Sequence, residues 1–186
     1  MDHDDIKIFA PEAAAEPTRA EDLDNLAAET EALRESGNLG AAKSLGRELA
    51  ALSAQNPELA ALSQSFGFTL TPARERQLHV LMVFSGQHAL CVQLPQLLSE
   101  AAVTAMNNYL INHSKAFWDT ISDGSAFTQY LLAAPAQKTA QARPVGEAFA
   151  RMCGQEDNPD LCTLGATVFT TAAELVKAKW EGKENL

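Results

Sequence analysis

The segment from Gln77 to Ser114 carries a single formal charge, Glu100, although 20% of the residues in the chain are charged. Helices that face solvent are normally covered by Lys, Glu, Arg and Asp side chains. A long segment that keeps polar residues but lacks charges is therefore expected to be hidden, either inside the core or against a partner. We expect the centre of the fold to lie in this segment.

The composition favours helices over strands. The 186-residue chain is 46% hydrophobic but only 6% aromatic, and Ala and Leu, which are abundant in it, lose little rotamer freedom in a helix. Apolar residues also recur at spacings of three and four, which is typical of helices with one buried face. The sequence therefore predicts an all-α fold, an irregular bundle of about seven or eight helices that begins with a helical hairpin.

Charge and composition divide the chain into three predicted domains. Residues 1–18 are expected to be a disordered acidic tail, because they contain too few apolar residues to offset the entropy of ordering. Residues 19–66 are predicted to form an acidic helical hairpin that turns at Gly37, and residues 68–186 a C-terminal helical core domain. The first helix of the hairpin has an apolar row of Leu23, Leu26, Thr30 and Leu33. The sequence does not place the hairpin on the core.

Three helices are predicted to form most of that core, starting at Pro72, Pro95 and Pro159. Thr71 and Asn158 precede a Pro, which is a typical arrangement of an N-cap and the first helical residue. The helix from Pro95 is expected to run without interruption to about Ile121. Its first apolar row is Leu98, Ala102, Ala105 and Tyr109. Its second apolar row is Met106, Leu110, His113, Phe117 and Ile121. The last helix, from Pro159, has one apolar row, which is Leu161, Leu164, Val168, Thr171, Leu175 and Ala178.

A minor alternative is a short two-stranded patch near residues 68–84, formed by Phe68–Leu70 and Leu78–Phe84. A short apolar run cannot be assigned to a helix or a strand by its periodicity alone. The helical interpretation remains the main prediction.

Several classes of function are disfavoured. A net charge of −10 repels phosphate backbones, which argues against nucleic-acid binding. The longest unbroken apolar run, Val80–Phe84, is far shorter than the roughly 20 residues of a membrane helix, so we expect no membrane partner. The acidic start of the chain is unlike a secretory leader, and three cysteines at no familiar spacing suggest reduced thiols; a cytoplasmic protein is expected.

The histidines and cysteines indicate two kinds of small-ligand site, and simple packing in the core is the competing explanation for each. A pocket lined by His79, His88, Tyr109 and His113 could bind a small molecule, although no nucleophile motif accompanies these residues and no catalytic residue is assigned. A metal site formed by Cys91, Cys153, Cys162 and His88 is the weaker idea, because no C-x-x-C spacing is present and thiols are commonly buried. We therefore expect no metal and no cofactor.

The uncharged polar residues of the central segment fit a protein–protein interface, although burial under other helices of the same chain comes first. Amides beside aromatic rings in a segment poor in charge are typical of such surfaces, and the candidate residues are Gln87, Gln93, Asn108, Tyr109, Phe117 and Trp118. The competing explanation is that other helices of the same chain cover this segment completely. The sequence thus predicts a non-enzymatic protein–protein interaction or scaffold module whose partner could be a second copy of itself; the alternative is a small-molecule-binding or catalytic helical bundle.

Overall fold

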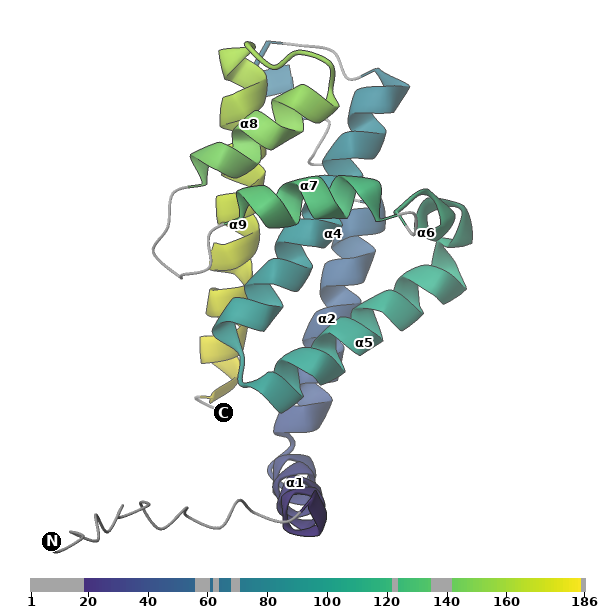
Figure 1. The fold of residues 1–186 in the computed structure, drawn as a ribbon, viewed down its shortest axis with the longest axis vertical. Helices are drawn as coiled ribbons and strands as arrows, with labels where there is room; N and C mark the ends of the chain where they lie inside the picture. Colours follow the sequence, from purple (N-terminus) through teal and green to yellow (C-terminus); the bar gives the residue numbers. More distant parts are fainter. Residues whose placement is uncertain are drawn as a thin grey trace, which may run out of the picture.

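A computed structural model describes residues 19–55, 61, 64–67, 71–121, 124–134 and 142–184. These residues form eight α-helices and no strand, which confirms the predicted all-α bundle (Figure 1). The helices are α1 (Arg19–Glu35), α2 (Asn38–Gln55), α4 (Pro72–Gln93), α5 (Gln96–His113), α6 (Lys115–Ile121), α7 (Ser125–Ala133), α8 (Arg143–Met152) and α9 (Pro159–Glu184). The predicted acidic tail, residues 1–18, lies outside the described residues.

Helix α4 is the centre of the fold and packs on α2, α5, α7, α8 and α9. It begins as predicted, with Thr71 Oγ1 accepting a hydrogen bond from the backbone N–H of Arg74 and Pro72 as the first helical residue. Since Leu78–Phe84 is helical, the alternative of a two-stranded patch is wrong there, and Phe68–Leu70 lies outside the described residues. The periodicity of this run does not distinguish a helix from a strand, and the packing of α4 against five other helices favours the helix.

Several aromatic rings gather around Phe84 in a core that is otherwise mostly aliphatic. This side chain is 4% exposed, and its ring centroid lies 5.4 Å from that of Tyr130, 5.8 Å from Phe127 and 6.4 Å from Phe169. The partners come from α7 and α9, so these contacts join the centre of α4 to two helices far along the chain.

Helix α2 packs into this core, and its most extensive partner is α5. Its inner face is fully buried at Ala42 and Leu45 and 4% exposed at Leu49. Gly46 allows the two backbones to approach closely, because a Cβ added there would lie 2.0 Å from the carbonyl oxygen of Ala102 on α5. No side chain fits at that distance, so this pair of helices requires glycine at position 46.

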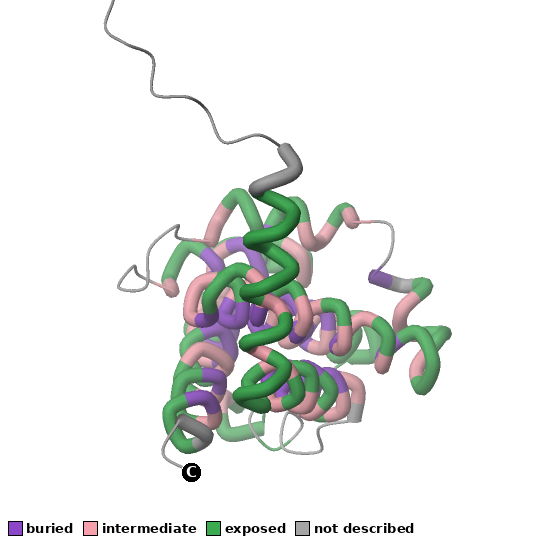
Figure 2. Tube along the Cα trace, turned by 90° about the horizontal axis from the view of Figure 1, so that it is seen from below, coloured by how far each residue is buried: buried purple, intermediate pink, exposed green. Residues whose placement is uncertain are grey.

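Helix α1 packs chiefly on α2 and lies across one end of the bundle, exposed along nearly its whole length (Figure 2). Gly37, with φ of +77°, makes the predicted left-handed turn between α1 and α2. In the apolar row of α1, Leu33 contacts the core, while Leu23 is 60% exposed and Leu26 is 46% exposed. The first three turns of α1 are therefore an acidic helix with uncovered leucines.

The prediction of one uninterrupted helix from Pro95 to Ile121 is wrong. The helix breaks at Ser114, which has φ of −144° and ψ of 50° and whose N–H still bonds to the Leu110 carbonyl oxygen at 2.8 Å. The preceding Asn and His have low helix propensity, so a break costs little there. After it, α6 turns and Phe117 contacts the ring of His79 on α4 edge to face, with centroids 5.9 Å apart.

Helices α8 and α9 form a second close pair. A Cβ at Gly146 of α8 would lie 2.0 Å from the Cys162 carbonyl oxygen, and one at Gly165 of α9 would lie 3.0 Å from the Gly146 Cα. Asn158 caps α9 as predicted, because its Oδ1 accepts from the N–H groups of Asp160 at 3.0 Å and Leu161 at 3.1 Å.

The predicted apolar row of α9 is right only in its first half. Leu161, Leu164 and Val168 are buried, but Thr171 and Ala178 are exposed. The residues that continue the buried face are Phe169, Val176 and Trp180. An alternating spacing of three and four averages 3.5 residues, whereas a straight helix has 3.6 residues per turn, so the buried face moves steadily along the sequence.

By length and composition, α9 is also apolar enough to cross a membrane, because an 18-residue window within Pro159–Gly182 has a mean hydropathy of 1.2; it is the only such helix among the described residues. Core helices of soluble proteins pass the same test. Here one face of α9 packs along α4 and α8, and 33% of the apolar window is buried.

Replacing Gly46 by Ala is expected to lower the free energy of unfolding by about 1–3 kcal/mol, because the added methyl group would overlap the α5 backbone. The matched control is Gly40→Ala in the same helix, where a Cβ meets nothing within 4 Å. That change should leave stability unchanged or raise it by up to about 1 kcal/mol. Urea unfolding followed by circular dichroism measures both. Equal effects of the two changes would contradict the close approach.

Candidate functional site

A groove of about 570 Å³ lies along α5, beside α2. Its floor is a row of half-buried residues on α5 spaced by four, so that they lie one above another on one face of the helix. These residues are Leu97, Ala101, Ala105 and Tyr109. The two alanines keep the floor low, which makes the groove an extended channel with no closed end.

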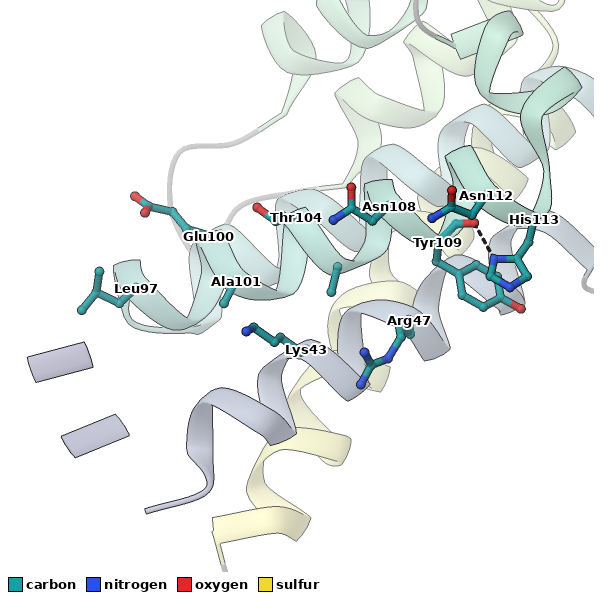
Figure 3. Close-up of a pocket in the computed structure, with 11 residues that line it drawn as sticks. Lys43, Arg47, Leu97, Glu100, Ala101, Thr104, Asn108, Tyr109, Asn112 and His113 are labelled. Atoms are coloured by element: carbon teal, nitrogen blue, oxygen red, sulfur yellow. Dashed lines mark hydrogen bonds between the residues drawn. The ribbon is translucent and has the colours of Figure 1, made fainter. Parts of the chain in front are cut away.

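Two walls of different chemistry flank this floor (Figure 3). On α5, a second row spaced by four consists of Glu100, Thr104, Asn108 and Asn112, all exposed. On α2, Lys43 and Arg47 stand one turn apart on the face opposite its buried leucines. Neither Lys43 nor Arg47 forms an ion pair with another residue that the structure describes. Glu100, the one acid of the groove, accepts a hydrogen bond from Gln96 at 3.0 Å.

Tyr109 and His113 stand at one end of the groove as a stacked pair. Their ring centroids are 4.2 Å apart with an angle of 13° between the planes, and the His113 Nδ1 lies 3.0 Å from the Tyr109 carbonyl oxygen. Glu100 lies thirteen residues before His113 on the same helix, or about 20 Å along its axis. The groove therefore does not place its acid within reach of its imidazole, and it offers surface for binding instead of a proton relay.

The structure does not bring the four predicted ligand-binding residues together. Tyr109 and His113 share the groove, while His79 and His88 lie elsewhere on α4. His79 contacts Phe117, and His88 lies against the rings of Phe84 and Phe169, with centroids 5.8 Å and 5.2 Å away. The two histidines of α4 thus pack against aromatic side chains of the fold.

The predicted interface residues divide in a similar way. Asn108 and Tyr109 line the groove. Gln87 donates to Asn107 Oδ1 at 2.7 Å and joins α4 to α5, and Gln93 donates to the Ala173 carbonyl oxygen at 2.8 Å and joins α4 to α9. Phe117 and Trp118 on α6 are half-buried against the core.

The three cysteines are free thiols on different helical segments. Cys153 lies beside Arg74 and Gln77, and burial raises the pKa of its thiol to about 11, an effect that Arg74 partly offsets. Cys162 lies on α9, with its Sγ 3.9 Å from the Glu156 carbonyl oxygen, and Cys91 is exposed on α4. Among the described residues, no three His, Cys, Asp or Glu side chains are grouped so as to hold one metal ion.

Several residues of the groove were not singled out from the sequence, chiefly Lys43 and Arg47. They are the only bases between Arg34 and Arg74, and they are spaced by four on a helix of an otherwise acidic segment. That spacing indicates a basic stripe on one helix face. Helix α5, which forms the other side of the groove, follows α2 by some fifty residues. No local sequence pattern predicts that these two helices pack together.

Burial at His79 predicts a pH dependence of stability. Desolvation lowers the pKa of this imidazole below 6.5, and Glu75 partly offsets the shift. The unfolded state then binds more protons, so the free energy of unfolding decreases as the pH falls through about 6.5 towards the lowered folded value. Urea titrations between about pH 8 and pH 5.5 should show this loss, and His79→Gln should reduce it. His113→Gln, at an exposed site, is the control; a loss that is unchanged in His79→Gln would contradict this account.

Comparisons of the chain with protein-family models, with curated proteins and with solved structures find no match. The geometry of the groove is therefore the observation that bears most directly on function.

Proposed function

We propose that this chain is a non-enzymatic protein–protein interaction module whose binding surface is the groove between α2 and α5. The observation that carries the proposal is the shape of the groove, a half-buried apolar floor along the whole exposed face of α5 between a cationic and an amide-rich wall. An elongated segment of protein, laid along α5, would contact the floor and both walls at once. This is the helix-in-groove mode of recognition, in which apolar contacts supply affinity and flanking polar groups supply orientation.

The charges of the groove indicate which segments it favours. Lys43 and Arg47 are exposed and make no ion pair with another described residue, so an acidic side chain could approach either of them without displacing a partner. The opposite wall, apart from Glu100, is neutral. The net charge of the chain is −10, so the stripe formed by Lys43 and Arg47 is a basic surface on an acidic protein. An acidic amphipathic segment is the chemistry that fits.

The alternative function, binding of a small molecule among four predicted residues, has less support. Only Tyr109 and His113 line the groove, and a pocket that buries a small ligand is normally enclosed and mostly apolar. The stacked pair stands at one end of an open channel, where it could contact only one side of a ligand.

A photo-crosslinking residue in the groove tests the proposal. With p-benzoylphenylalanine in place of Asn108, a lysate of cells that naturally produce the protein should give covalent adducts with protein, because Asn108 is exposed on the groove wall. The control carries the same residue at Thr170, which is exposed on α9. Adding Lys43→Glu and Arg47→Glu should remove the Asn108 adducts. Equal yields at the two positions, or adducts that survive the charge reversal, would contradict a binding role for the groove.

A further inference from the structure

Helix α1 carries two exposed leucines near its N-terminal end. Leu23 and Leu26 are 60% and 46% exposed, and they lie three residues apart on one face of a helix. Large exposed apolar side chains that share a helix face commonly mark a binding surface. Residues 22–29 of α1 are all exposed, and Figure 2 shows the helix crossing the end of the bundle.

This helix is also the most acidic one in the structure. Its sequence holds six acids and two bases, which gives 2 − 6 = −4. The acids are Glu21, Asp22, Asp24, Glu29, Glu31 and Glu35, and the bases are Arg19 and Arg34. Glu31 is paired with Arg34, whereas Asp22, Asp24 and Glu29 make no ion pair with another described residue. An acidic helix with exposed leucines is the kind of segment that suits the groove between α2 and α5.

We propose that the groove binds α1 of a second copy of this chain; the inference rests on the proposed function. Leucines of the incoming α1 would lie on the row from Leu97 to Tyr109, and its acids would face Lys43 and Arg47. The lengths agree, because α1 has 17 residues and spans about 25 Å, while the groove from Leu97 to His113 spans about 24 Å.

Charge complementarity favours this arrangement over a dimer in which α1 of one copy pairs with α1 of the other. If two copies associated by pairing α1 with α1, each helix would bring a net charge of −4 to the contact, and like charges at an interface are strongly unfavourable. Placing α1 beside Lys43 and Arg47 brings opposite charges together instead. The α1 helix of the same copy does not lie along this groove, since it joins α2 at Asn38, five residues before Lys43, and crosses the end of the bundle.

The same contact made twice closes a dimer. Each copy has one helix to donate and one groove to accept it, so two copies related by a two-fold axis satisfy both sites and leave none open for further growth. The expected assembly is therefore a dimer held by two equivalent α1–groove contacts.

Two complementary variants test the inference. The first, Lys43→Glu with Arg47→Glu, disables the groove and keeps α1. The second, Leu23→Ser with Leu26→Ser, disables α1 and keeps the groove. All four side chains are exposed, so both variants should keep the unfolding transition of the original chain. The matched control is Leu131→Ser with Leu132→Ser on α7, at side chains that are 66% and 78% exposed.

Sedimentation equilibrium and native mass spectrometry give the readout. The original chain and the α7 control should dimerise alike, and each α1 or groove variant alone should dimerise at least about tenfold more weakly. An equimolar mixture of the two variants should form a 1:1 heterodimer, since one intact helix then meets one intact groove. An original chain that stays monomeric at its highest soluble concentration, or a mixture that gives no heterodimer, would overturn the inference.

The crosslinker at Asn108 separates this inference from the proposed function. An adduct with the mass of two copies of this chain supports both. An adduct of the groove with another protein, sensitive to the Lys43 and Arg47 reversals, keeps the interaction function and overturns the second copy as the occupant. Absence of protein adducts at Asn108 overturns both.

Discussion

The fold depends on the close approach of helix backbones at a few glycines. Gly46 lets α2 meet α5 at Ala102, and Gly146 lets α8 meet α9 at Cys162. These two helix pairs have the most extensive packing in the described structure. Contact at this range removes side chains from between the helices and fixes how far each can slide or rotate, because interiors are close-packed and deform little. The groove follows from one of these contacts: α2 lies tight against α5, and Lys43 and Arg47, on the neighbouring turns of α2, stand beside the exposed face of α5.

The scarcity of charge between Gln77 and Ser114 has two physical origins. On α4, it reflects burial against five helices, and two of its amides join helices, Gln87 by a hydrogen bond to Asn107 and Gln93 by one to the Ala173 carbonyl oxygen. Half-buried amides such as these are tolerated because hydrogen bonds within the chain replace those to water. On α5, by contrast, a row of Thr and Asn stays exposed and uncharged except at Glu100. Burial within the chain thus explains the scarcity of charge on α4, whereas the exposed row on α5 belongs to the surface proposed above for binding.

Features set by a few neighbouring residues could be predicted from the sequence, and features set by distant residues could not. The caps at Thr71 and Asn158 and the turn at Gly37 depend on local backbone chemistry, and all three are confirmed. The break at Ser114 could not be predicted because the apolar spacing continues into α6, where Phe117 contacts His79 of α4, a residue distant in the sequence. For the groove, the sequence identified Asn108, Tyr109 and His113 on α5 but not Lys43 and Arg47, since their role depends on how α2 packs against a helix some fifty residues away.

The two halves of the proposed contact would contribute different things. Exposed ion pairs are weak and are screened by salt, so Lys43 and Arg47 would mainly orient an incoming acidic helix and reject a basic one. Most of the free energy would have to come from burying leucines on the floor of the groove, at about 25 cal/mol for each Å² of apolar surface removed from water. The low floor matters for that reason: Ala101 and Ala105 allow leucine side chains to approach the α5 backbone, whereas larger residues would hold the helix away. Affinity would then be set by shape and selectivity by charge.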